Sequence, residues 1–145
     1  MRLLVDTDAF CKLGIAGLFE PVLDLLGVGL EDCGRLPALP HMLRRGRLPK
    51  LLGQSVCDSL LPMAESIAAA PAPGAAWLDL LRAVTGIDPG EALLFAAAAE
   101  SSLTVVTGDK RAIRALAALP EFQEALASRI VTIEAVLLAL CRRVG

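Results

Sequence analysis

Hydrophobic residues in this chain form short continuous runs, separated by stretches in which they recur at helical spacing. The runs at residues 3–5, 103–107 and 129–133 are typical of strands buried on both faces of a sheet. A further strand near residues 35–39 would contain Pro37, which disfavours a central position. The predicted helices are residues 9–26 (as two short helices), 41–52, 55–70, 77–84, 88–101, 110–119, 121–128 and 134–143.

Helices separate the predicted strands, so neighbouring strands should pair in parallel. The predicted fold class is therefore α/β, a three-layer sandwich with a central, mainly parallel sheet. A length of 145 residues suits one core, and residues 1–145 are predicted to form a single domain. A hydrophobic content of 55% with 21% charged residues excludes a disordered chain.

The charge balance restricts how the chain could bind nucleic acid. The net charge of −2, from 14 basic and 16 acidic residues, is unlike that of a general nucleic-acid binder. Binding would need a local basic patch, and the candidates for phosphate contacts are Arg44, Arg45, Arg47 and Lys50. A solvated helix face is the more common explanation of such a run. Aromatic residues make up 3% of the chain, so few side chains could stack on bases.

The cysteines and the first residues indicate the compartment. None of the four cysteines stands in a C-x-x-C pair and His41 is the only histidine, which disfavours a structural zinc site. Buried free thiols in a reducing compartment are expected instead. Two acids among the first eight residues disfavour a signal peptide, and the apolar window at residues 92–99 is too short to span a bilayer. We expect a soluble, cytoplasmic protein without a membrane partner.

Acidic residues follow two of the predicted strands. Asp6 comes directly after residues 3–5 and Asp109 comes one glycine after residues 103–107. Asp8 follows Asp6, and Asp88 and Glu91 lie where the helix that leads to the second strand begins. Because function gathers at the carboxyl ends of parallel strands, we expect Asp6, Glu91 and Asp109 to converge. Gathered carboxylates repel one another, and a hard divalent cation such as Mg²⁺ is the usual counter-ion.

Helix capping is an alternative explanation of the same acids. Residues 88–91 read Asp-Pro-Gly-Glu, which is the Asp form of a capping box. Asp8 and Asp109 could cap the helices that follow them. Asp6 is the least suited to capping, because it ends a strand and Asp8 is the better placed cap. Both explanations stay open for each acid.

The motifs taken together resemble those of PIN-domain ribonucleases. Residues 3–8, Leu-Leu-Val-Asp-Thr-Asp, are similar to the opening strand of that family. Residues 88–100 and 105–110 are similar to its later half, where an acidic helix start leads through an Ala-rich helix to a strand that ends in Asp. Residues 130–133 fit its last strand.

The resemblance implies an endonuclease that cleaves single-stranded RNA and depends on Mg²⁺ or Mn²⁺. It implies Asp6, Glu91 and Asp109 as catalytic residues, and these three with Asp8 and Asp88 as metal ligands. Lys110 joins the basic cluster as a candidate phosphate contact. Many small members of the family are toxins with an antitoxin partner, and many are homodimers.

Two alternatives follow from departures and from a second motif. The family usually has another catalytic Glu after the second strand, whereas residues 40–46 contain no acid. A catalytically degenerate PIN-like domain that binds RNA or protein is therefore the first alternative. The Asp-x-Asp motif of Asp6 and Asp8 also occurs in haloacid-dehalogenase-type phosphatases, where the first Asp is a nucleophile. Ala9 and Phe10 replace the Gly-Thr expected there. His41 could be a ligand or base, although a lone histidine is more often incidental.

Overall fold

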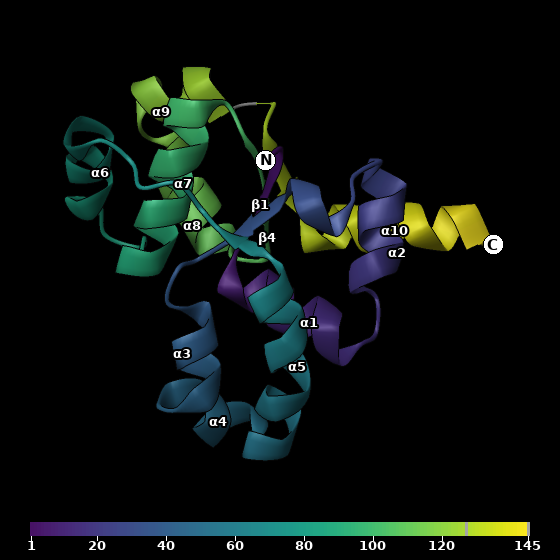
Figure 1. Cartoon of the computed structure of the whole chain (residues 1–145). Coiled ribbons are helices and arrows are strands. Elements are labelled where there is room, and N and C mark those ends of the chain that lie inside the picture. Colours follow the sequence, from purple (N-terminus) through teal and green to yellow (C-terminus); the bar gives the residue numbers. More distant parts are fainter. Residues whose placement is uncertain (127, 145) are drawn as a thin grey trace.

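The computed structural model of the chain describes residues 1–126 and 128–144. Within these residues a sheet of five parallel strands has the order β3-β2-β1-β4-β5. The strands are β1 (Leu3–Val5), β2 (Cys33–Arg35), β3 (Ala68–Ala69), β4 (Thr104–Thr107) and β5 (Ile130–Thr132). Helices lie on both sides of the sheet (Figure 1), so the predicted three-layer α/β sandwich with a parallel sheet is confirmed.

The helices form three groups around the sheet. One side carries α1 (Thr7–Ile15), α2 (Phe19–Leu26) and α10 (Ile133–Val144), and α10 packs against α2. The other side carries α6 (Ala75–Arg82), α7 (Pro89–Ser101), α8 (Lys110–Ala117) and α9 (Pro120–Leu126). A lobe below the sheet in Figure 1 consists of α3 (Leu39–Arg44), α4 (Arg47–Leu52) and α5 (Gln54–Ser66). A short turn of 3-10 helix, η1 (Leu30–Asp32), precedes β2.

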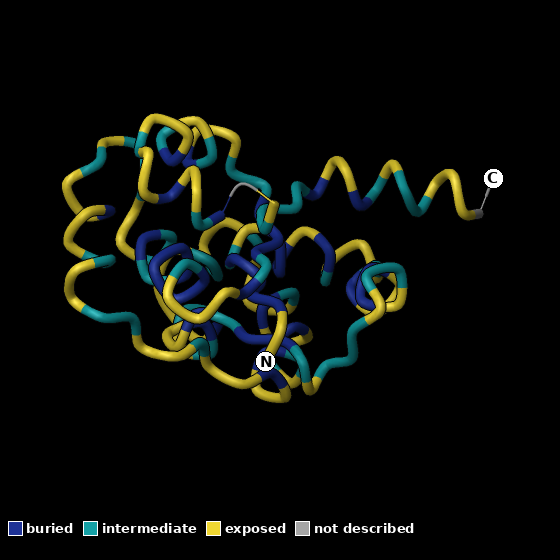
Figure 2. Tube along the Cα trace, turned by 90° about the horizontal axis from the view of Figure 1, so that it is seen from above, coloured by how far each residue is buried: buried dark blue, intermediate teal, exposed yellow. Residues whose placement is uncertain are grey.

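The core lies around the central strand. All three residues of β1 are buried, and the buried aromatic rings of Phe10 and Phe95 come from helices α1 and α7. In β2, a Cβ on Gly34 would lie 2.7 Å from Cδ2 of Leu4, which is too close for any side chain. Glycine at this position therefore allows the Leu4 side chain to pack against β2. In Figure 2 the buried residues concentrate around the sheet, and helix α10 extends away from them toward the C-terminus. In the described part of the chain, no helix combines the length and apolar content needed to cross a membrane.

Several predicted boundaries were wrong, and the structure shows the cause of each. The second strand is Cys33–Arg35 rather than residues 35–39, because the chain turns after Arg35 and α3 begins at Leu39. The helix predicted over residues 55–70 ends at Ser66, and Ala68–Ala69 pairs with β2 instead. The helix predicted over 41–52 is two helices, because Gly46 has a φ of 103° that interrupts the helical backbone.

The remaining elements lie close to their predicted positions. The two short helices of residues 9–26 are α1 and α2, and the first begins two residues early, at Thr7. The last predicted strand loses Ile133 to α10. For the helix predicted over 121–128, α9 ends at Leu126 and Ser128 lies in a turn. Ala127 and Gly145 lie outside the described residues.

Candidate functional site

The order of the strands places two acids side by side. β1 pairs with β2 on one side and with β4 on the other. The chain therefore continues from β1 to β2 and β3 on one side, and then crosses to β4 and β5 on the other side of β1. Asp6 directly follows β1 and Asp109 follows β4 after Gly108. This is the topological switch point of the parallel sheet, where a crevice forms between diverging connections.

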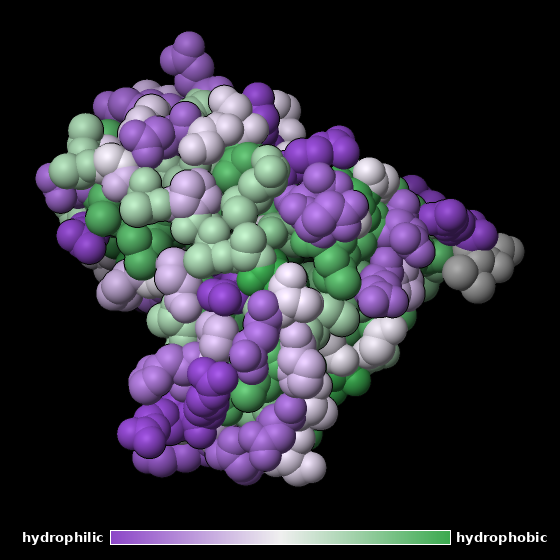
Figure 3. Space-filling view, in the orientation of Figure 1, coloured by the Kyte–Doolittle hydropathy of each residue, from purple (hydrophilic) through white to green (hydrophobic). Residues whose placement is uncertain are grey.

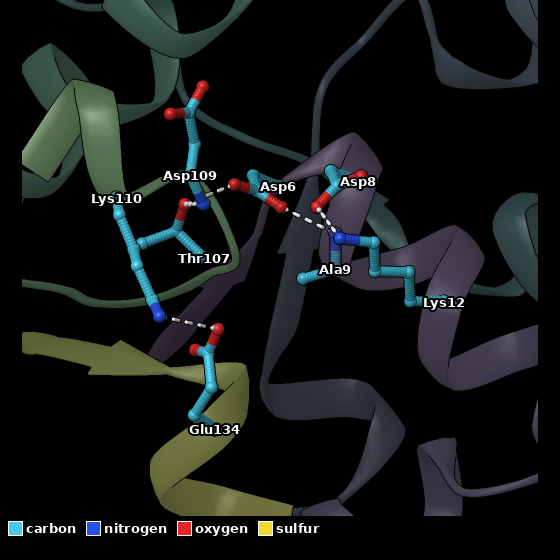
Figure 4. A network of polar contacts seen from close by, with 8 residues as sticks. All are labelled: Asp6, Asp8, Ala9, Lys12, Thr107, Asp109, Lys110 and Glu134. Atoms are coloured by element: carbon cyan, nitrogen blue, oxygen red, sulfur yellow. Dashed lines mark hydrogen bonds and ion pairs between the residues drawn. The ribbon is translucent and has the colours of Figure 1, made fainter.

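Asp6 is fixed at the end of β1 by two hydrogen bonds. It is 4% exposed. Its Oδ1 accepts a hydrogen bond from the Ala9 backbone N–H at 2.6 Å, and its Oδ2 accepts one from the Thr107 hydroxyl (Figure 4). Burial raises the pKa of Asp6 to about 6, the charges of Asp8 and Asp109 add to the rise, and the two hydrogen bonds oppose it.

Asp6, rather than Asp8, is the N-cap of α1. The prediction that Asp8 caps this helix was wrong, because the helix begins at Thr7 and therefore takes its cap from the residue that ends the strand. Asp8 lies in the first helical turn instead, where a negative charge interacts favourably with the helix dipole. Asp6 thus has both a structural contact and a place in the crevice.

Thr107 connects the two strand ends and was not predicted from the sequence. Its side chain is fully buried at the last position of β4. The hydroxyl donates to Asp6 and accepts a hydrogen bond from the Asp109 backbone N–H at 3.1 Å. A threonine at the carboxyl end of the strand, two residues before Asp109, was the available signal, and only the pairing of β1 with β4 gives it a partner.

Asp88 and Asp109 cap the helices that follow them, as predicted. Oδ1 of Asp88 accepts from the Glu91 N–H at 2.7 Å, and Oδ1 of Asp109 accepts from the Ala112 N–H at 3.0 Å. Each of these caps uses one carboxylate oxygen. Capping and a role in the crevice are therefore compatible for both acids.

Glu91 does not complete a capping box. Among the described residues, no hydrogen bond returns from the Asp88 amide to the Glu91 side chain, and Oε2 of Glu91 is buried without a hydrogen-bond partner. Burial, followed by the neighbouring carboxyl groups of Asp88 and Asp109, raises the pKa of Glu91 to about 9. This carboxyl group is therefore held in an acidic environment that disfavours its charge.

Two further acids at the crevice are paired with lysines. Oδ2 of Asp8 lies 3.1 Å from Nζ of Lys12, and Oε1 of Glu134 lies 3.4 Å from Nζ of Lys110 (Figure 4). Asp8 also packs against the end of β4, since a Cβ on Gly108 would come within 2.7 Å of its Oδ2. Glu134 was not predicted as a site residue. The signal was its place two residues after β5, which parallels the place of Asp109 after β4.

A single cleft of about 1080 Å³ brings these groups together. The acids that line it are Asp6, Asp8, Asp88, Glu91, Asp109 and Glu134. The facing wall comes from α3, α4 and the turn between them, and its lining residues are His41, Met42, Arg45, Gly46, Arg47, Leu48, Leu51 and Leu52. Hydrophilic residues gather over the outer surface of this lobe, and the molecule narrows where the lobe joins the body (Figure 3).

The basic residues proposed from the sequence divide into two sets. Arg45, Arg47 and Lys110 line the cleft. Arg44 and Lys50 are not among its lining residues, and Nη2 of Arg44 lies 3.3 Å from Oε1 of Glu65 on α5. The break between α3 and α4 changes the helical phase, so the four cluster residues do not share one face.

Comparison with known proteins identifies the fold but not a family. No protein family and no curated protein matches the chain. Among solved structures, the chain is similar to the crystal structure of PAE2754 from Pyrobaculum aerophilum, with a TM-score of 0.58, 20% identity and 98% of each chain covered. At this identity the similarity shows that both chains share an overall fold along their whole length.

The donor set at the cleft fits a hard divalent cation. Within residues 1–126 and 128–144, no group of three His, Cys, Asp or Glu side chains is already arranged to hold a metal ion. Burial is the largest cause of the raised pKa values of Asp6 and Glu91, and neighbouring carboxyl groups add to it. Oε2 of Glu91 is also buried without a hydrogen-bond partner, and a cation beside it would offset both effects. Carboxylate oxygens are the ligands that Mg²⁺ and Mn²⁺ favour.

Proposed function

We propose that this chain is a metal-dependent endoribonuclease of the PIN type that cleaves single-stranded RNA. The observation that carries the proposal is the gathering of Asp6, Glu91 and Asp109 in one cleft at the switch point of the sheet. The unpartnered Glu91 oxygen is the feature of this cluster that a cation would relieve. In this proposal Asp6, Glu91 and Asp109 hold Mg²⁺ or Mn²⁺, with Asp8 and Asp88 in support.

The bound ion would supply an activated water molecule and stabilise negative charge on the phosphodiester. The chain's own residues would do the positioning. Thr107 and the Ala9 amide hold the Asp6 carboxyl in one orientation, so this group needs no rearrangement. Arg45 and Arg47 on the facing wall would bind phosphate groups of the strand. Lys110 would also bind a phosphate group, and its ion pair with Glu134 would then break.

Location and partners belong to the same proposal. We place the activity in the cytoplasm, where single-stranded RNA is available. The resemblance of residues 3–8 and 88–110 to PIN domains suggests an antitoxin protein and a second copy of the chain as partners.

One observation favours a second candidate function. The helix that follows β2 has His41 at the cleft and no acid between residues 40 and 46, where the resemblance expects a catalytic Glu. This favours a degenerate PIN-like domain that binds RNA without cleaving it. We do not propose the phosphatase alternative, because Ala9 and Phe10 stand where the phosphatase motif has Gly-Thr after Asp-x-Asp.

A cleavage assay tests the proposal. Labelled single-stranded RNA is incubated with the wild-type chain in Mn²⁺, Mg²⁺ or a chelator, beside Asp109→Asn and a control, Asp24→Asn, on the exposed surface of α2. Asparagine can cap α8 as aspartate does, so Asp109→Asn removes charge while keeping the fold. We expect cleavage only with metal, lost in Asp109→Asn and retained in the control. RNA binding without cleavage would favour the degenerate domain, and cleavage in chelator would overturn the metal-dependent mechanism.

A further inference from the structure

Helix α4 exposes an apolar surface to the cleft. In the described chain, this six-residue helix has no fully buried residue, and Gly46 and Gly53, with φ values of 103° and 92°, bound it. Leu48, Leu51 and Leu52 line the cleft, and Leu51 is 66% exposed. Folding alone does not explain why a leucine stays so open to solvent in a concave site, whereas a ligand that covers it would.

A second exposed hydrophobic residue lines the same cleft. Ile15, at the end of α1, also lines the cleft and is 53% exposed. The other strongly exposed large hydrophobic residues among those described, namely Met1, Leu80 and Leu138, do not line it. The cleft therefore gathers two strongly exposed large hydrophobic side chains, those of Leu51 and Ile15.

Charge next to the apolar wall indicates the chemistry of its ligand. Arg45 and Arg47 line the same cleft as Leu48, Leu51 and Leu52, so two cationic groups share the cleft with the leucines. A nucleotide combines these two needs, since its base has apolar faces and its phosphate binds arginine. The wall formed by α3 and α4 lines the same cleft as Asp6 and Asp109. A nucleotide bound at this wall could therefore belong to the same RNA strand as the phosphodiester at the acids.

We infer that the α3–α4 wall is a nucleotide subsite, in which a base packs on Leu48, Leu51 and Leu52 while Arg45 and Arg47 bind its phosphate. The inference rests on the proposed function and names the part of the substrate that the cleft holds beside the acids. Among the described lining residues there is no Phe or Trp, and Trp77 packs on Phe122 elsewhere with ring centroids 5.0 Å apart. Leucine offers no hydrogen bond to a base edge, so the subsite accepts unpaired bases with little sequence preference.

Binding measured without metal tests the subsite separately from cleavage. The probe is a fluorescein-labelled oligouridine of roughly ten nucleotides, within the site sizes common for single-strand binders, and its matched probe has the same backbone without bases. Anisotropy titrations in chelator compare wild type with Leu51→Ser, Leu51→Met and the control Leu80→Ser on α6, which is 40% exposed outside the cleft.

We expect Leu51→Ser to weaken oligouridine binding by about tenfold, the loss of one base contact. Leu80→Ser should bind as wild type does, Leu51→Met should lose less affinity than Leu51→Ser because it keeps an apolar side chain, and Leu51→Ser should bind the baseless probe no more weakly than wild type. Arg47→Ala should weaken binding of both probes. Equal binding by Leu51→Ser and Leu80→Ser, or no binding of oligouridine by wild type, would overturn the subsite.

A contact between two copies of this chain is the alternative explanation of the exposed leucines, and the oligomeric state tests it. If sedimentation shows that Leu51→Ser converts a dimer into a monomer, the wall is a contact between two copies of this chain and the nucleotide subsite is wrong. The result also separates the two proposals. Base-dependent binding without metal-dependent cleavage would support the subsite and contradict the nuclease proposal. Metal-dependent cleavage, with oligouridine binding unaffected by Leu51→Ser, would support the nuclease proposal and contradict the subsite.

Discussion

The hydroxyl of Thr107 donates a hydrogen bond to Oδ2 of Asp6, although 101 positions separate the two residues in the sequence. The same hydroxyl accepts a hydrogen bond from the Asp109 amide. Both side chains of this pair are buried. One hydroxyl group therefore connects the ends of β1 and β4, and it holds the side chain of Asp6 and the backbone of Asp109 in place.

Thr107→Val should expose the importance of that hydroxyl. The replacement leaves Oδ2 of Asp6 without a donor and the Asp109 amide without an acceptor, so the free energy of unfolding should fall by about 1–3 kcal/mol. The pKa of Asp6 should also rise further, because the hydroxyl now lowers it. Urea unfolding and NMR titration of Asp6 measure the two effects. Thr104→Val, at the start of the same strand, is the control, and equal stability of the two variants would contradict the prediction.

Asp6→Asn and Asp6→Ala should separate the cap from the chemistry. Asparagine can still accept from the Ala9 amide, so Asp6→Asn should change the free energy of unfolding by about 1 kcal/mol or less. Asp6→Ala removes the cap and leaves Thr107 unpaired, and should cost about 1–3 kcal/mol more. RNA cleavage should be lost in both. If Asp6→Asn unfolds as easily as Asp6→Ala, the charge of Asp6 is structural.

Stability of the metal-free protein should fall as the pH rises from about 4.5 to about 9. Glu91 has a pKa of 4.5 when unperturbed and about 9 in the fold, so in this range the native state holds a proton that the unfolded state lacks. Its stabilising contribution is complete below 4.5 and is lost as the pH rises toward 9. Urea unfolding of wild type and Glu91→Gln across this range measures it. The variant should show a flatter profile, and Glu124→Gln, on the exposed face of α9, should follow wild type.

Divalent ions should stabilise the wild-type protein. A ligand that binds only the native state adds about 2.7 kcal/mol when its concentration is 100 times its dissociation constant. Glu91→Gln and Asp109→Asn should need more Mg²⁺ or Mn²⁺ for the same rise in Tm, whereas Asp24→Asn should respond as wild type does. Thermal melts over a metal titration measure this. An identical response of Glu91→Gln and wild type would mean that Glu91 is not a ligand, and no response in any variant would favour the degenerate domain.

Arg47→Ala should weaken RNA binding more than Arg44→Ala. Arg47 lines the cleft, whereas Arg44 pairs with Glu65 outside it. Removing one phosphate contact to a single strand should reduce the slope of log K against log salt by about 0.7. Anisotropy titrations at several salt concentrations measure the slope. Equal effects of the two substitutions would place the phosphate path outside the cleft.

Local patterns in the sequence were sufficient for the main elements and for the caps of α7 and α8. β1 is an apolar run of three residues and β4 has two valines between threonines, and both patterns are typical of strands. Asp88 and Asp109 cap the next helix through bonds that span three residues, so neighbouring residues decide them. The expectation that acids after parallel strands meet at one edge rests on the same local positions.

Contacts between distant segments decided the rest. Ala68 and Ala69 have no strand propensity of their own and are a strand because Gly34 and Arg35 offer them a parallel ladder. Glu134 joins the cleft only because β5 pairs with β4.

The site shows the same division between sequence and tertiary structure. From the sequence, Asp6 is an acid after a strand and Thr107 is the end of another strand. Their hydrogen bond exists because the tertiary fold sets β1 against β4. Burial of the same site raises the pKa of Asp6, and the hydrogen bond from Thr107 opposes that rise. A sequence pattern records which residues are near along the chain, whereas the pKa values and partners of these acids depend on which residues are near in space.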